Sequence, residues 1–138
     1  MGIALMIDNV ATELGRGDFV HAFFSTLSAR LEPRGWGTRF PILMNELYQG
    51  ELPKAHAAQA LEELRTARSE LLGFPPTEVV WDIENRSAQP PWGMDISSDI
   101  TSLASYFVTS TGRDMFDAMI EDLEFLRDQG TGPATLVG

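Results

Sequence analysis

The spacing of apolar residues along the chain predicts three amphipathic helices. They span residues 18–31, 54–72 and 113–128. In each, apolar side chains recur every three or four positions, which places them on one face of a helix. Asp18 is in position to cap the first helix, and Pro33 and Gly35 should end it. A further one or two helical turns are expected at Leu43–Tyr48.

Four other segments have the composition or the alternation expected of strands. They are Gly2–Ile7, Thr38–Ile42, Val79–Glu84 and Ala104–Thr109. In Val79–Glu84 every second residue is apolar, and this period of two is typical of a half-buried strand. Val10–Leu14 is interpreted instead as a short helical turn. This order predicts an α+β fold in which a small, mostly antiparallel sheet of three or four strands is covered by three main helices. Residues 1–130 then form a single domain, and residues 131–138 a flexible tail.

Composition narrows the class of protein. The chain has 138 residues, 43% of them hydrophobic, which suits one globular domain with an ordinary core. It contains no cysteine, which excludes disulfides, thiolate chemistry and cysteine-ligated zinc. No apolar run approaches the length of a membrane span. A cytoplasmic location fits these observations.

The negative charge is concentrated in the second half of the sequence. Residues 1–77 hold nine acidic and seven basic side chains, a net charge of −2. Residues 78–138 hold eleven acidic and three basic ones, a net charge of −8. Nucleic acids and anionic membranes are therefore poor direct partners, because they carry the same sign. A basic protein would be steered towards the acidic half, although a solvated face that only maintains solubility is the simpler interpretation.

Few residues are arranged for chemistry. Asp82 and Glu84 would lie on one face of the predicted strand, ~7 Å apart, where paired carboxylates can exchange protons or bind a metal. A solvent-facing strand surface explains the same pair. His21 and His56 are far apart, and no spacing of metal ligands, no phosphate-binding loop and no nucleophile motif is present. We therefore expect no catalytic residues, no metal, no cofactor and no enzymatic activity.

Trp92 follows two prolines in the segment Gln89–Gly93 (QPPWG). Consecutive prolines fix the backbone, so this loop should hold the indole in one place. Two roles are open for the side chain. It can cover the edge of the core, as a tryptophan usually does, or it can anchor a partner protein.

Four segments, taken together and in order, resemble a family of bacterial polymorphic-toxin immunity proteins, the immunity protein 70 family. They are Arg39–Leu52 (RFPILMNELYQGEL), Val79–Glu84 (VVWDIE), Gln89–Gly93 (QPPWG) and Ser105–Asp117 (SYFVTSTGRDMFD). The resemblance extends from about residue 20 to residue 128. It implies an α+β protein of the cytoplasm that is made beside a toxin, binds the toxin domain and neutralises it. It carries over no catalytic residue.

The resemblance and the charge pattern together lead to a binding hypothesis. The partner would be the cognate domain of a contact-dependent or secreted toxin, and it would dock on the acidic half. A nuclease is one possible toxin of this kind, because nuclease active sites are basic. The expected contacts are Asp82, Glu84, Trp92, Asp95 and Asp99. Two alternatives stay open. One is a small metal-binding or hydrolytic enzyme that uses Asp82 and Glu84, and the other is a generic protein-binding adaptor.

Overall fold

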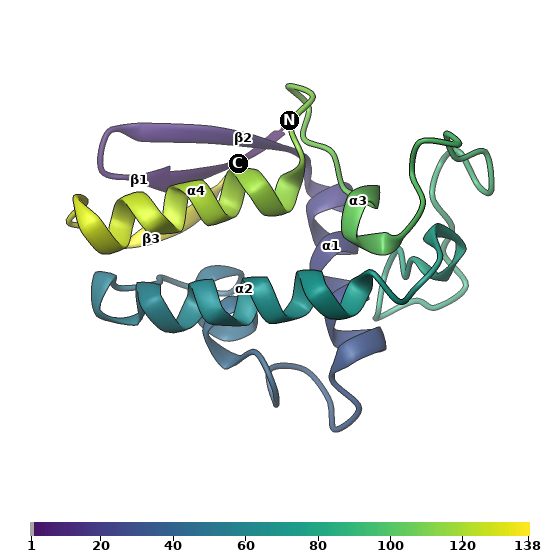
Figure 1. Cartoon of the computed structure of the whole chain (residues 1–138), viewed down its shortest axis with the longest axis horizontal. Helices are drawn as coiled ribbons and strands as arrows, with labels where there is room; N and C mark the ends of the chain where they lie inside the picture. Colours follow the sequence, from purple (N-terminus) through teal and green to yellow (C-terminus); the bar gives the residue numbers. More distant parts are fainter. Residues whose placement is uncertain (1) are drawn as a thin grey trace.

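A three-stranded antiparallel sheet forms one side of the molecule in the computed structural model, which describes residues 2–138 (Figure 1). Its strands are β1 (Gly2–Ile7), β2 (Val10–Arg16) and β3 (Ala134–Val137), in the order β2-β1-β3. Both neighbours of β1 run antiparallel to it. The prediction of an α+β fold with a small antiparallel sheet is confirmed, but only β1 was among the expected strands.

Asp8 explains why the other two strands lie where they do. With Asn9 it makes the two-residue connection of a hairpin, and it adopts a left-handed φ of 55° that aspartate and asparagine tolerate. Its carboxylate accepts bonds from the hydroxyl and backbone N–H of Thr131, at 2.6 and 2.9 Å, and from the N–H of Gly132. These bonds lower the pKa of the Asp8 carboxyl and bring the end of the chain against β1.

The helices agree better with the sequence pattern. The long ones are α1 (Gly17–Leu31), α2 (Ala57–Leu71) and α4 (Met115–Asp128), and the short ones are a π-helical turn η1 (Ile42–Leu47), α3 (Leu103–Tyr106), and the 3₁₀ turns η2 (Lys54–His56) and η3 (Pro76–Glu78). α2 and α4 lie side by side (Figure 1). Asp114 caps α4, since its carboxylate accepts the N–H of Asp117 at 3.0 Å. Asp18 does not cap α1; it lies in the first turn and pairs with Arg16.

Two structural predictions, one near each end of the chain, were wrong. Val10–Leu14 is part of β2 and not a helical turn, because the turn at Asp8 folds it back on β1. Ala134–Val137 forms β3, where a frayed tail was expected. In both cases the pairing partner is β1, and pairing with another segment is not visible in the residue pattern of the strand itself.

Thr38–Ile42, expected to be an edge strand, is held by a side chain instead of a neighbouring strand. The carboxylate of Glu32, at the end of α1, accepts the backbone N–H groups of Gly37, Arg39 and Phe40 at 3.0, 3.1 and 2.9 Å. Glu32 is only 3% exposed. Because these donors are satisfied by one buried carboxylate, the segment needs no sheet.

Val79–Glu84 and Ala104–Thr109 are not strands either. The hydroxyl of Thr26 on α1 exchanges hydrogen bonds with both backbone groups of Val80, at 3.1 and 3.2 Å, and Ser25 accepts the N–H of Ile83 at 3.1 Å. Two hydroxyls of α1 thus replace the neighbouring strand. Further on, Ser102 caps α3, which takes up the first residues of the other expected strand.

Asp122, on α4, is a buried carboxylate whose Oδ2 atom has no hydrogen-bond partner among the described residues. Burial raises the pKa of this carboxyl. A raised folded-state pKa means that the folded protein holds the proton more tightly than the unfolded chain. The resulting stabilisation is present at low pH and is lost as the pH rises through the folded pKa.

We therefore expect Asp122→Asn to be more stable than the wild type near neutral pH, by about 1 kcal/mol, and this gain should shrink in acid. Urea unfolding of both proteins at about pH 4.5 and about pH 7.5 measures the difference. Asp95→Asn, at an exposed position, is the control and should show no such trend. An Asp122→Asn gain that does not depend on pH would contradict this assignment.

Candidate functional site

A long irregular segment, residues 79–102, connects η3 to α3 and contains neither helix nor strand. It forms the end of the molecule opposite the β1–β2 turn (Figure 1). Loops of this length are uncommon inside compact domains and are usually functional. All five residues predicted to contact a partner lie in this segment.

Trp92 is part of an aromatic cluster and is also accessible to solvent. Its ring packs edge-on against Trp81 and Phe19, with centroids 5.4 and 6.0 Å away. Its indole N–H donates a 2.8 Å hydrogen bond to the hydroxyl of Tyr106. The side chain nevertheless stays 41% exposed. The indole is thus fixed by its neighbours and presents one part of its surface outward.

Trp92 takes part in the lining of two open hollows. The first has a volume of about 230 Å³ and is lined mostly by apolar side chains, including Trp81 and Pro91. The second, of about 400 Å³, includes Ile96 and Ile100. Phe19, Trp92 and Val108 line both of them. We call the two hollows with these three residues the Trp92 surface.

Asp18 and its ion-pair partner Arg16 both line the first hollow, but two other acidic side chains near this surface have no cationic partner among the described residues. Asp95 lines the second hollow, and Asp95 and Asp99 are both exposed. Within residues 2–138, no basic group forms an ion pair with either of them. By contrast, the acids of α4 are mostly paired with arginines. Those pairs join Arg68 to Asp114 and Asp117, Arg113 to Glu121, Arg65 to Glu124 and Arg127 to Asp128. Much of the negative charge of the second half of the chain is thus neutralised on α4, and unpaired charge remains in residues 79–102.

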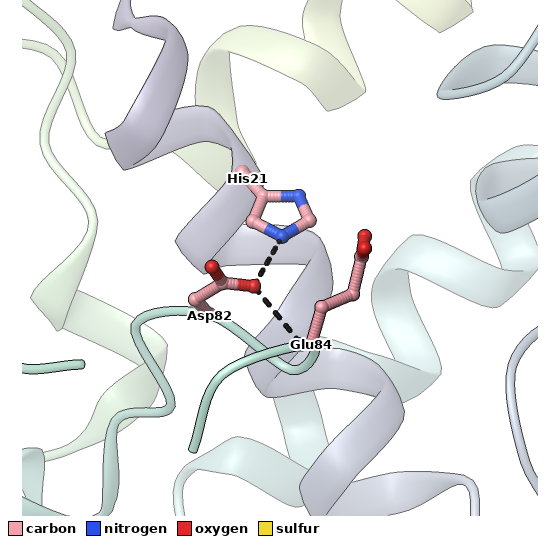
Figure 2. A group of neighbouring side chains, drawn as sticks. All are labelled: His21, Asp82 and Glu84. Carbon is pink, nitrogen blue, oxygen red and sulfur yellow. Dashed lines mark hydrogen bonds and ion pairs between the residues drawn. The ribbon is translucent and has the colours of Figure 1, made fainter. Parts of the chain in front are cut away.

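Asp82 and Glu84 lie apart from the Trp92 surface, in a group with His21 of α1 (Figure 2). The Nε2 atom of His21 lies 3.0 Å from Oδ1 of Asp82, and its Nδ1 atom lies 2.6 Å from the hydroxyl of Tyr48. Oδ1 of Asp82 also accepts the N–H of Glu84 at 2.9 Å. The bonds from Glu84 and His21 lower the pKa of the Asp82 carboxyl.

The strand face predicted for Asp82 and Glu84 was wrong, because the backbone turns between them. Sequence reasoning also missed His21 as their neighbour. The histidine precedes Asp82 by 61 positions, and no short motif joins residues so far apart. The one signal in the sequence that could have drawn attention to His21 was its position on the polar side of the helix predicted over residues 18–31. Four of the five predicted contacts therefore divide into two groups, with Trp92 and Asp95 beside one hollow and Asp82 and Glu84 beside His21. The fifth, Asp99, is exposed and belongs to neither group.

None of the helices in residues 2–138 combines the length and the apolar character of a membrane span. No curated protein and no solved structure matches the chain. A family model, that of immunity protein 70, matches residues 5–133. This match covers nearly the whole sequence, including both hollows and the group around His21. The chain therefore belongs to the immunity protein 70 family and is an immunity protein.

Proposed function

We propose that this immunity protein binds its cognate toxin domain through the Trp92 surface and neutralises it by covering the toxin's active site. The observation that carries the proposal is the fixed, partly exposed indole that lines two open hollows. The encounter would take place in the cytoplasm, between this chain and the C-terminal toxin domain encoded beside it.

The apolar character of the surface supports a role as an anchor. Tryptophan is enriched among the few residues that dominate binding energy, and such residues lie in well-packed places near the centre of an interface. Trp92 loses little side-chain freedom on binding, because Trp81, Phe19 and Tyr106 already hold it. A partner side chain could enter either hollow and enclose the indole on that side.

The unpaired acids support a basic partner. Glu84, Asp95 and Asp99 have no ion-pair partner in the part of the chain that the structure describes. Arg86 is the only basic residue in 79–102. The negative electrostatic field of these unpaired carboxylates attracts a positively charged protein and raises its association rate, most strongly at low salt. A nuclease fits this description, because its active site binds negatively charged phosphates and is therefore basic.

The charge part of the proposal leads to a kinetic prediction. We expect Asp95→Asn/Asp99→Asn to slow association with the toxin domain by roughly threefold to tenfold at low salt, and to reduce the salt dependence of the association rate. Dissociation should change much less, because these exposed acids would lie at the rim. Surface plasmon resonance against the neighbouring gene's C-terminal domain, at two salt concentrations, measures both rates.

Glu121→Gln/Glu124→Gln is the matched control, since it removes the same total charge from acids that are already paired with arginines. It should have a smaller effect on association. An association rate that ignores salt in the wild type, or an equal slowing by both double variants, would count against docking at the Trp92 surface.

A further inference from the structure

Three potential metal ligands meet between α1 and the irregular segment. They are the imidazole of His21 and the carboxylates of Asp82 and Glu84, and their ligand atoms all lie within 4.8 Å of one another (Figure 2). The docking proposal uses only the exposed charge of Glu84 and not the grouping of these three side chains. Two of the three residues come from one turn and the third from a helix, so the chain must be folded before the group exists.

The spacing of these atoms suits chelation after a small adjustment. A zinc ion about 2.1 Å from each ligand in tetrahedral geometry holds neighbouring ligand atoms roughly 3.4 Å apart. The Nε2 atom of His21 and Oδ1 of Asp82 are already 3.0 Å apart. Glu84 is exposed and forms no ion pair within residues 2–138, so its side chain can rotate towards the other two. A bound ion would coordinate both of these atoms and so replace the direct contact that now joins His21 to Asp82.

The surroundings resemble those of metal-binding histidines. Such a histidine generally uses its second ring nitrogen for a hydrogen bond that fixes the orientation of the ring. In this chain Nδ1 of His21 has that bond, to the hydroxyl of Tyr48 at 2.6 Å, and Tyr48 in turn stacks on the buried ring of Phe24. Nε2 is thereby directed at the carboxylate of Asp82. An open hollow of about 370 Å³, lined by His21, Tyr48 and Glu84, gives an ion access.

We propose that His21, Asp82 and Glu84 bind a divalent transition-metal ion, with zinc as the best match. One imidazole nitrogen and two carboxylate oxygens favour zinc, manganese, cobalt or nickel over calcium and magnesium, which prefer oxygen ligands alone. Three protein ligands leave at least one position on the ion for water or for a side chain of a partner. The ion would fasten the start of residues 79–102 to α1.

Isothermal titration calorimetry of the full chain with ZnCl₂, after removal of metal by a chelator, tests this site. We expect one zinc per chain. Glu84→Gln and His21→Ala should each weaken binding at least about tenfold, and Tyr48→Phe should weaken it by roughly tenfold through loss of the orienting bond. Magnesium should give no comparable heat. Circular dichroism must show that each variant is folded, and Glu84→Gln is the safest because its side chain is exposed and unpaired.

The chain offers a matched control in His56, which lies 2.7 Å from a single carboxylate, that of Glu46. His56→Ala should leave the stoichiometry and affinity of zinc binding unchanged. The proposal is overturned if the wild type takes up no zinc, because the group is then an ion pair only. It is equally overturned if Glu84→Gln binds zinc as tightly as the wild type, or if His56→Ala abolishes binding.

Discussion

Replacing Trp92 by alanine is expected to raise the dissociation rate of the toxin complex about thirtyfold or more, which corresponds to a loss of at least about 2 kcal/mol of binding energy. The side chain is 41% exposed, and the hydrogen bond to Tyr106 and the contacts with Trp81 and Phe19 hold it in place. A partner that encloses it would lose this contact area in the variant. Association should slow less, because the acids that steer the partner remain.

Met94 supplies the control for this experiment. It lies in the same segment and is 68% exposed, but it lines neither hollow. Met94→Ala should therefore change the dissociation rate by less than about threefold. Circular dichroism and thermal unfolding must first show that Trp92→Ala is folded. A folded Trp92→Ala variant that dissociates at the wild-type rate would exclude Trp92 as the anchor.

Glu32→Ala is expected to cost about 3–5 kcal/mol of stability, since it removes the acceptor of three backbone N–H groups in a buried place. Those donors belong to Gly37, Arg39 and Phe40. With the carboxylate gone, they have no strand to pair with, and the connection between α1 and η1 loses its support. A loss of this size is a large part of the total stability of a domain of this length.

Chemical denaturation of three proteins would measure this effect. Glu32→Gln keeps one acceptor oxygen and should cost less than Glu32→Ala. Glu62→Ala, at an exposed position of α2, should change stability by less than about 0.5 kcal/mol. If Glu32→Ala unfolds at the same denaturant concentration as Glu62→Ala, then Glu32 does not hold residues 37–40 in the way described.

The helices could be predicted from the sequence because each carries its own signal. Apolar residues recur at helical spacing in α1, α2 and α4, and this period is visible without knowledge of what the helices pack against, even in α1, which is buried on all sides along residues 22–28. The strands depended on distant partners. The alternation in Val79–Glu84 is that of a strand, yet the hydroxyls of Ser25 and Thr26, more than fifty positions earlier, satisfy its backbone.

The candidate site was predictable only in part for the same reason. The prolines before Trp92 and the excess of acids are local features, and they drew attention to the segment that the structure leaves without helix or strand. Sequence alone could not show which acids lack a partner, because that depends on arginines elsewhere, such as Arg68 beside Asp117. It also could not bring His21 to Asp82, which requires α1 and residues 79–85 to pack together.

Hydrogen–deuterium exchange of the chain alone and in complex with the toxin domain tests the docking proposal most directly, because it locates the interface without any substitution. We expect slower exchange on binding in residues 79–102 and at the start of α1 around Phe19. Little change is expected at the β1–β2 turn, which lies at the other end of the molecule (Figure 1). Protection confined to that turn and to α2, with residues 79–102 exchanging as fast as in the free chain, would contradict docking through the Trp92 surface.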